Sequence, residues 1–402
     1  MIKDIAIILV VVAVAAALFH PRLVRDWKWR ATVTPLASII GSGFLVLGPI
    51  LDYSYGYLAP AVMASLCTAA YLFGAAIRRN IAQLEQQAWE TGSLESRLEV
   101  LASWVLAFAY VISVAYYLNL FGAFSVSMFD TGQAGNGRTV TSGVLIFLLI
   151  IGWTRGFSAL ESLEQVSVSI KLAIICGLLV GLAWFFAEKS AAHDLVLNPP
   201  PLGLWEGFVL ALGLIITVQG FETSRYLADE YDAQTRISTM RRAQWISAGI
   251  YVLYIGLLSF LFPPGVLELR ETAIIDLMRI VTPLLPMILI AGALTAQISA
   301  ATADMAGSGG LLFELSKGRI SQRAAYAGLV AIGLVLTWSA NIFEIISYAS
   351  RAFALYYATQ CAIAASAAWR RDRAFPSTIL YAALTVVGFA IFILAVPAEG
   401  GQ

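Results

Sequence analysis

Two short glycine-containing motifs lie in the middle of long apolar stretches, where freed backbone groups could bind a ligand. Residues 41–43 (Gly-Ser-Gly) interrupt the stretch 32–52, and residues 217–222 (Thr-Val-Gln-Gly-Phe-Glu) interrupt the stretch 204–227. Glycine favours non-helical backbone and polar side chains are costly against lipid, so both stretches are predicted to be membrane helices that unwind near mid-span. Unwinding exposes N–H groups that bind a carboxylate and C=O groups that bind an ammonium, which together suit a zwitterion.

The two motifs occupy corresponding places in the two halves of the chain. Gly41 and Gly220 are 179 residues apart, with about five apolar stretches in each half. Interrupted helices at corresponding positions of two halves are the best sequence indication of a transporter binding site. The alternative is that these glycines only allow helices to pack closely. The shared spacing favours the transporter interpretation.

Two cations lie deep within apolar stretches and form the second candidate for chemistry. Lys171 lies in the stretch 163–187 and Arg351 in the stretch 341–368, and they are 180 residues apart, so they too occupy corresponding positions. Charged residues inside a membrane are functional by default, and the alternative is a structural contact with a carboxylate or with helix-end carbonyls.

The chemistry of the two side chains predicts different roles for them. A lysine removed from water can exchange a proton near neutral pH, whereas arginine cannot. Lys171 is therefore a candidate for proton coupling, and Arg351 is expected to be a structural clamp or a charge offered to an anionic substrate. The acidic residues predicted to approach these cations are Glu222 and Asp304.

Composition indicates which elements must hold these residues. The 402-residue chain is 59% hydrophobic and only 12% charged, so most of it belongs in a lipid bilayer. A spanning helix needs about 20 mostly apolar residues. Twelve such stretches are predicted, at 3–20, 32–52, 54–77, 99–127, 139–154, 163–187, 204–227, 243–264, 282–313, 323–340, 341–368 and 376–397. The connections are short, so residues 1–402 are predicted to form a single membrane domain.

The basic residues predict how these helices are oriented. Of the 25 Lys and Arg residues, 18 lie in alternate connections beginning with 21–31, five lie in the other connections, and two are Lys171 and Arg351. Cytoplasmic connections carry an excess of Lys and Arg, so both termini are expected to be external. The expected location is a bacterial inner (plasma) membrane. Because its basic cluster follows the apolar run, the stretch 3–20 is expected to be a retained helix rather than a cleaved signal peptide.

The same sequence argues against several other functions. Three cysteines lie in apolar stretches without paired spacing and the two histidines lie in polar connections, so neither a metal site nor a cofactor is expected. The sequence has no HExxH motif, nucleophile elbow or histidine pair, so the protein is not expected to be an enzyme. Equal numbers of cationic and anionic residues, 25 each, give no reason to expect a nucleic-acid partner.

These motifs together resemble the amino acid–polyamine–organocation (APC) superfamily and its amino acid permeases. Residues 41–43 look like the glycine motif of the first broken helix of that family. Residues 220–222 (Gly-Phe-Glu) and the basic loop that reaches Arg242 resemble its sixth-helix signature. Lys171 matches a fifth-helix lysine found in many sodium-independent members. The resemblance covers most of the chain.

The resemblance implies an all-α integral membrane protein with a 5+5 inverted-repeat, leucine-transporter-like bundle and about 12 transmembrane helices. The first repeat is expected at 32–187 and the second at 204–368. Residues 1–31 are then an extra N-terminal helix with a basic cytoplasmic loop, and 376–397 is one additional C-terminal helix. These two additions depart from the usual family pattern, as does Arg351.

The resemblance also implies alternating access around a central site for a small-molecule substrate. The amides of Ser42 and Gly43 are expected to hold a carboxylate, and carbonyls near Ile40, Val218 and Gln219 are expected to hold an amine. The implied substrate-binding set is Ile40, Gly41, Ser42, Gly43, Tyr110, Val218, Gln219, Gly220, Thr295, Ser299 and Tyr348.

The predicted function is secondary active transport of an amino acid or a related small amine or carboxylate, without sodium and with a proton as candidate coupling ion at Lys171. One alternative is a sodium symporter in which Ser299 and Thr302 supply oxygens of an ion site between the first and eighth core helices. The buried ammonium of Lys171 argues against it, because it would repel sodium. The other alternative is a non-transporting sensor or accessory subunit on the same scaffold, against which the short connections argue.

Overall fold

The structure is a computed structural model and describes residues 2–41, 43–86, 89–90, 92–127, 134–154, 164–228, 230–263 and 269–398. Within these ranges the regular elements are helices, and none of the described residues forms a β-strand. The predicted all-α architecture is therefore confirmed.

The helices follow one another with short connections. In the first part of the chain they are α1 (Ile2–Leu18), α2 (Pro21–Val24), α3 (Trp27–Ile39), α4 (Gly43–Tyr55), the 3-10 helix η1 (Gly56–Leu58), α5 (Ala59–Gln86), α6 (Leu94–Ser127), α7 (Ala134–Thr154) and α9 (Glu164–Ala191). In the second part they are α10 (Leu204–Gly213), η2 (Ile215–Val218), η3 (Phe221–Tyr226), α11 (Ala233–Leu258), α12 (Ala273–Val281), α13 (Leu284–Leu315), α14 (Gln322–Ser339), α15 (Ile342–Arg370) and α16 (Phe375–Leu394).

The described helices form twelve columns, where a column is one helix or a set of shorter helices that follow one another across the molecule. These columns match the twelve predicted spans. α3 with α4 fills the first broken stretch, α10 with η2 and η3 fills the second, and the other ten columns are α1, α5, α6, α7, α9, α11, α13, α14, α15 and α16. By length and composition alone, six continuous helical stretches of the described residues are apolar enough to cross a membrane. The remaining columns are shorter, broken or less apolar.

Two features of the helices differ from the predictions. No helix was expected at α12, whose nine residues bury an apolar face and turn Asp276 and Arg279 outward. In addition, α5 continues to Gln86 and α11 begins at Ala233, about nine to ten residues beyond the predicted spans. An apolar run marks only the part of a helix that lies in lipid, and a helix can continue past it when its end is capped. At α11 the side chain of Asp232 accepts a hydrogen bond from Thr235 N at 2.7 Å.

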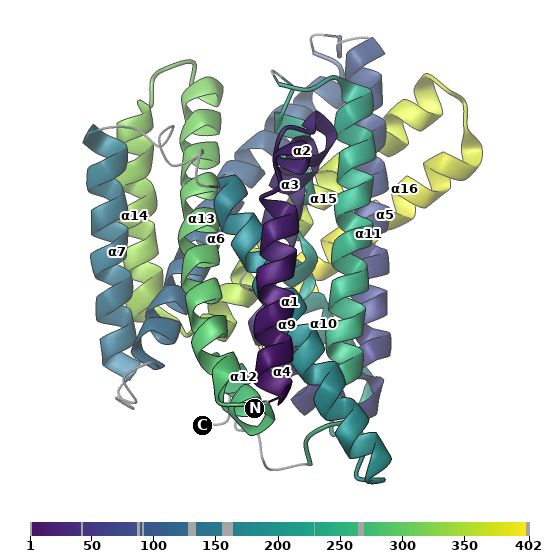
Figure 1. Cartoon of the computed structure of the whole chain (residues 1–402). Coiled ribbons are helices and arrows are strands. Elements are labelled where there is room, and N and C mark those ends of the chain that lie inside the picture. Colours follow the sequence, from purple (N-terminus) through teal and green to yellow (C-terminus); the bar gives the residue numbers. More distant parts are fainter. Residues whose placement is uncertain are drawn as a thin grey trace.

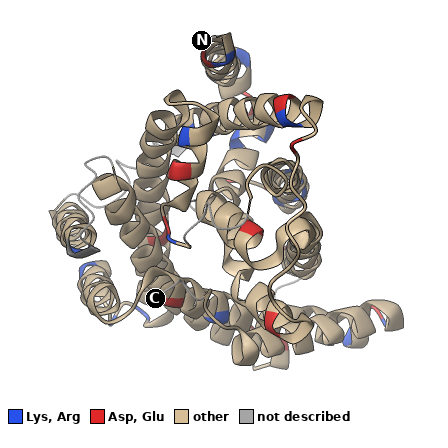
Figure 2. Cartoon of the chain, turned by 90° about the horizontal axis from the view of Figure 1, so that it is seen from below, with Lys and Arg blue, Asp and Glu red and all other residues tan. Residues whose placement is uncertain are grey.

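Two groups of helices enclose the centre of the molecule. α6, α7, α13 and α14 pack against one another and are called the scaffold here, while α3, α4, α5, α11 and the η2–η3 segment pack together and are called the bundle. α15 packs along both α6 and α16, and α9 lies against α1, α3 and α13. Figure 1 shows the α7–α14 pair at one edge of the molecule and α16 at the opposite edge. In the perpendicular view of Figure 2, the helices are arranged around central elements.

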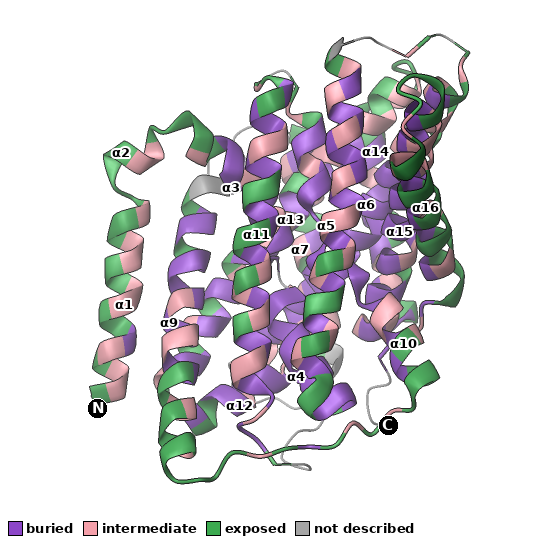
Figure 3. Ribbon diagram, turned by 90° about the vertical axis from the view of Figure 1, so that its right-hand side faces the viewer, coloured by how far each residue is buried: buried purple, intermediate pink, exposed green. Residues whose placement is uncertain are grey.

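Burial distinguishes the central helices from those at the perimeter (Figure 3). α6 and α15 supply several of the largest fully buried side chains, among them Tyr116, Phe124 and Tyr357. α1 and α16 instead expose large apolar side chains, such as Leu9 at 63% and Val386 at 68%. Exposed apolar surface on helices of this length is what a lipid bilayer covers.

Both ends of the described chain lie on the same face of the molecule, and α2 lies on the opposite face (Figure 1). The predicted alternation of the connections between two faces therefore agrees with the arrangement of the helices. The assignment of the basic face to the cytoplasm stays a prediction.

Candidate functional site

The first predicted break is present where the glycine motif lies. α3 ends at Ile39, the backbone of Ile40 leaves the helical region with φ −85° and ψ 62°, and α4 begins at Gly43. Gly41 lies between the two half-helices, and Ser42, a predicted ligand of the substrate carboxylate, lies outside the described residues. The backbone here is unwound near mid-span, as the sequence predicts.

The second break is longer than the sequence predicts. α10 ends at Gly213, and the chain continues as η2, an extended Gln219, Gly220 and η3. Gly220 has φ +115°, a conformation that an L side chain rarely adopts, which explains why glycine occupies this position. The described residues from Leu214 to Leu227 form no α-helix, so only the first part of this broken stretch is α-helical.

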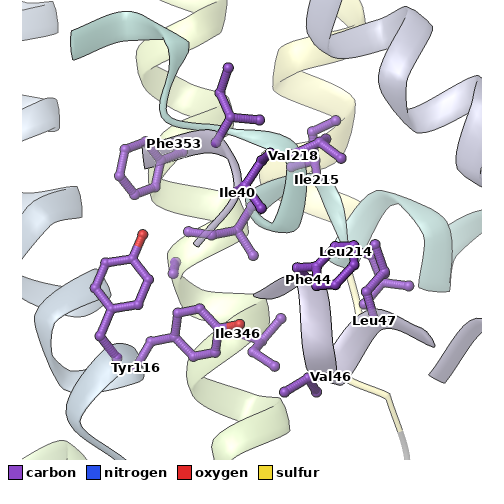
Figure 4. Packing of buried hydrophobic residues seen from close by; sticks show 14 of the residues in the cluster. Ile40, Phe44, Val46, Leu47, Tyr116, Leu214, Ile215, Val218, Ile346 and Phe353 are labelled. Carbon is purple, nitrogen blue, oxygen red and sulfur yellow. The ribbon is translucent and has the colours of Figure 1, made fainter. Parts of the chain in front are cut away.

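The two breaks cross each other in direct contact. A Cβ atom placed on Gly220 would lie 2.5 Å from Ser38 C and 2.7 Å from Ile39 N, so glycine is what allows the second break to touch the end of α3. A Cβ on Gly43 would lie 3.2 Å from the Cα of Thr217. Figure 4 shows Ile40 and Phe44 of the first break in one cluster with residues of the second break.

Tyr251 on α11 joins the two breaks through its hydroxyl group. Its Oη lies 2.9 Å from Ile39 O and 2.7 Å from Thr217 O, one carbonyl from each break. Both carbonyls belong to backbone that unwinding removes from helical hydrogen bonds, and they share the single hydroxyl proton in a site where water is scarce. Tyr251 carries no signal of this role in the sequence, because a tyrosine within an apolar stretch resembles an ordinary core residue.

Other freed carbonyls remain available for a ligand. Among the described residues, no N–H or O–H group donates to the carbonyls of Ile40, Val218 or Gln219, the predicted amine ligands. The N–H of Gly220 is already used, because it donates to Glu222 Oε2 at 3.0 Å. The breaks therefore present acceptors for an ammonium group more clearly than donors for a carboxylate.

Lys171 on α9 reaches the end of the first half-helix. Its Nζ donates to Ala37 O at 2.8 Å, in the last turn of α3. A cation at this position also interacts favourably with the negative end of the α3 dipole. Lys171, Gly41 and Ala296 line a cavity of about 20 Å³, space for roughly one water molecule. This contact with a helix-end carbonyl is one of the two structural alternatives considered for the lysine.

The two buried acidic residues are held by uncharged groups. Glu222 is fully buried and its Oε2 also accepts a hydrogen bond from Tyr357 OH at 3.0 Å. Its Oε1 has no hydrogen-bond partner among the described residues. Asp304 accepts a hydrogen bond from Ser113 Oγ, across the contact between α13 and α6. Neither carboxylate forms an ion pair with Lys171 or Arg351 within the described residues, in contrast to the prediction.

The predicted pocket residues on α6 and α13 lie in different surroundings. Tyr110 is buried between these helices, with its ring 6.0 Å from the ring of Phe353 and within electrostatic reach of both buried carboxylates. Ser299 is half-buried on α13. Thr295 does not face the site: its side chain is exposed, and its Oγ1 donates to Ala291 O of its own helix.

Tyr348 is also outside the site. It is 41% exposed and lies on the face of α15 opposite to Ser350 and Tyr357, which turn toward the second break. The prediction was wrong because sequence position alone does not determine the rotation of an apolar helix.

Arg351 is a structural clamp, not a substrate ligand in this arrangement. Its Nε donates to Ala395 O at 3.1 Å, at the end of α16, and Nη2 donates to the same oxygen. A helix end leaves carbonyls unpaired, and the guanidinium satisfies one of them. Of the two roles expected for Arg351, the structure supports the clamp.

An ion pair closes the basic face between the bundle and the scaffold. Arg225 in η3 lies with its Nη2 2.6 Å from Glu99 Oε1 on α6, and both side chains are largely buried. Arg236 on α11 adds a hydrogen bond of 2.9 Å to the carbonyl of Arg225. A second cavity at the breaks, lined by Val218 and Tyr251, measures about 10 Å³. Each of these two cavities has room for about one water molecule.

Helical columns with apolar outer faces and two crossed breaks at their centre define an integral membrane transporter. The chain belongs to the APC superfamily, because the family model described as "APC superfamily transporter" matches residues 21–395. A protein of Aquifex aeolicus (strain VF5), described as an uncharacterized protein, is 42% identical over 355 residues, which covers 86% of this chain and 85% of that protein.

Solved transporter structures share the fold. Mhp1, a nucleobase-cation-symport-1 family transporter in a closed conformation with bromovinylhydantoin bound, superposes with a TM-score of 0.58 at 12% identity, over 92% of this chain and 91% of that one. A manganese transporter of Eremococcus coleocola gives a TM-score of 0.57 at 12% identity, over 91% and 87%. These similarities confirm the predicted inverted-repeat, leucine-transporter-like fold.

Proposed function

We propose that this transporter carries an amino acid, or a related small molecule with an amine and a carboxylate, by alternating access at the two breaks. The observation that carries the proposal is the contact between the two breaks at mid-span, where the carbonyls of Ile40, Val218 and Gln219 accept no hydrogen bond from the described residues. An ammonium group bound there gains several acceptors in a dry environment. In this proposal the backbone N–H groups at the start of α4 bind the carboxylate of the substrate.

The closed packing fits one state of such a cycle. Substrate binding is expected to move the bundle away from the scaffold, since each of the two cavities described at the breaks has room for only about one water molecule. Opening toward the basic face requires the ion pair between Arg225 and Glu99 to separate, because it spans the bundle and the scaffold. Alternating access then amounts to rigid movement of the bundle around the crossed breaks.

Lys171 is the proposed coupling residue. Its ammonium group supports the last turn of α3 through Ala37 O, directly before the first break. When Lys171 loses its proton, the charge at the negative end of the α3 dipole disappears and the contact weakens. Protonation is therefore expected to bias the position of the first break, which is how proton movement would be linked to transport.

The geometry does not favour the sodium-coupled alternative. The Lys171 ammonium donates to Ala37 O at the end of α3 and lines the cavity between α4, α9 and α13, so a positive charge already stands beside the place where sodium would bind. Transport of manganese is not favoured either. Within the described residues, no group of three or more His, Cys, Asp and Glu side chains could hold a metal ion.

The proposal is tested with full-length protein in liposomes. A thermal-shift screen of amino acids first identifies a ligand, and uptake of that ligand is then measured with and without a sodium gradient and over a range of pH. We expect uptake to be independent of sodium and to depend on pH. Lys171→Ala is expected to remove the pH dependence, while Lys189→Ala, a matched change at the exposed end of the same helix, is expected to retain it.

Three results would contradict parts of this proposal. Uptake that requires sodium at fixed pH refutes proton coupling and supports the alternative symporter. Unchanged pH dependence in Lys171→Ala refutes the role of Lys171 alone. Failure of every amino acid to alter thermal stability or to move across the liposome membrane refutes the substrate class and favours a sensor or accessory function.

A further inference from the structure

Gln297 on α13 is a buried carboxamide that the site described so far does not use. It is fully buried, and neither its Nε2 nor its Oε1 has a hydrogen-bond partner among the described residues. Other buried carboxamides are partnered: Asn119 donates to Ala115 O at 2.8 Å, and Gln244 donates to Ala70 O at 2.9 Å. A buried polar group without a partner is destabilising, so Gln297 is better explained by a ligand that it meets during transport.

Gln297 lies on the part of α13 that packs near the first break. The preceding turn of α13 contributes Ala293 and Ala296 to the cavity that Gly41 also lines. Asp304, two turns further along, lies on the same face of the helix. Gln297 therefore belongs to the central face of α13, in contrast to the exposed Thr295.

The contact between α13 and α6 fixes the depth of Gln297. The two helices run in opposite directions, with Ser113 of α6 bonded to Asp304 of α13. Gln297 precedes Asp304 by seven residues, so it lies level with about Leu120 on α6, within one turn of Tyr117. Tyr117 is itself at the breaks, because its hydroxyl oxygen lies 3.7 Å from the position of a Cβ on Gly41.

A second buried carboxamide approaches the same tyrosine. Gln219 lies within the second break, with its Nε2 3.5 Å from Tyr117 OH, and its Oε1 has no partner among the described residues. Gln219 and, by its level along α13, Gln297 thus both lie near the height of Tyr117, and each has a polar atom without a hydrogen-bond partner among the described residues. Gln219 belongs to the bundle and Gln297 to the scaffold, so a ligand between them would contact both moving parts.

The chemistry of a carboxamide indicates what such a ligand offers. A glutamine side chain presents an N–H donor and a C=O acceptor side by side. A carboxamide or cyclic amide on the ligand satisfies both groups, whereas a carboxylate satisfies only the donor and a hydrocarbon satisfies neither. We propose that Gln297 binds the substrate side chain and selects substrates that carry an amide group. This rests on the proposed function, in which the breaks hold the amine and carboxylate and leave the side chain to Gln297.

The test compares three amino acids of similar length: L-glutamine, L-glutamate and L-methionine. Their affinities are measured by calorimetry on the purified full-length protein. We expect L-glutamine to bind about 5- to 150-fold more tightly than L-methionine, the range for leaving a buried hydrogen-bonding group unpaired. In Gln297→Met the preference is expected to disappear through weaker binding of L-glutamine. Gln322→Met, a matched change at the exposed start of α14, is expected to keep it.

The outcomes separate this proposal from the one on which it rests. Equal binding of all three amino acids by the wild-type protein overturns amide selection and leaves amino acid transport standing. A preference for L-glutamine that persists in Gln297→Met overturns the role of Gln297. Binding of none of the three overturns amide selection and the amino acid substrate class together. If Gln297→Met does not fold, the ranking by the wild-type protein still decides whether amide selection exists.

Discussion

Replacing Gly220 by alanine tests whether the two breaks touch as closely as the structure indicates. The residue has φ +115°, and an L side chain in a left-handed conformation costs about 1–2 kcal/mol. The new Cβ would lie 2.5 Å from Ser38 C and 2.7 Å from Ile39 N, which are backbone atoms that cannot rotate away. Overpacking of this kind costs about 1–3 kcal/mol. We therefore expect Gly220→Ala to lower the free energy of unfolding by about 2–5 kcal/mol.

Thermal unfolding of the purified protein in detergent measures this effect. Gly249→Ala is the matched control, because Gly249 lies on α11 with open space where its Cβ would be, and alanine favours a helix. We expect the control to melt at the same temperature as the wild type or higher, and Gly220→Ala to melt clearly lower. Equal stability of the two variants would show that the breaks do not approach each other as described.

Three further predictions concern individual hydrogen bonds. Tyr251→Phe leaves buried carbonyls at the breaks without their donor and is expected to cost about 1–3 kcal/mol in thermal unfolding, whereas Tyr57→Phe, at a half-exposed side chain, is expected to change nothing. Arg351→Gln is expected to speed amide hydrogen exchange at the end of α16 while uptake continues, and loss of uptake with unchanged exchange would contradict the clamp. The ion pair between Lys3 and Glu188, with 2.7 Å between Nζ and Oε2, joins the start of α1 to α9. Hydrogen exchange at the start of α1 is therefore expected to be faster in Glu188→Gln than in the wild type, and an unchanged rate would contradict this role of the ion pair.

Much of the fold could be predicted because lipid imposes a length and a composition on every helix that crosses it. The twelve predicted stretches each contain a helical column, including the two that are broken. α12 was not predicted because its nine residues are far fewer than a membrane span needs. Its apolar residues nevertheless lie on one face and its charged residues on the other. The extensions of α5 and α11 escaped it because they continue past the apolar run.

The breaks could be predicted for a different reason: glycine lowers the stability of a helix, and at the second break the backbone has a conformation that favours glycine. Gly220, with its positive φ and its contact with α3, is the clearest case. Side chains that line the centre were harder to select. Lipid-facing and core-facing positions are both apolar, so polarity does not reveal how a membrane helix is rotated. Thr295 and Tyr348 were therefore chosen wrongly, while Tyr251 and Gln297 were overlooked.

The bridge from Tyr251 has a consequence for how the protein is made. Its hydroxyl bonds to Ile39 O, a group 212 positions earlier in the chain. At a synthesis rate of about 5–20 residues per second, the first break waits about 10–40 s in the bilayer before its partner is translated. During that time the first half of the protein holds an unwound helix that only the second half completes. The first five core helices alone therefore lack the hydroxyl group that bonds to the first break, and they gain it only when α11 has been made.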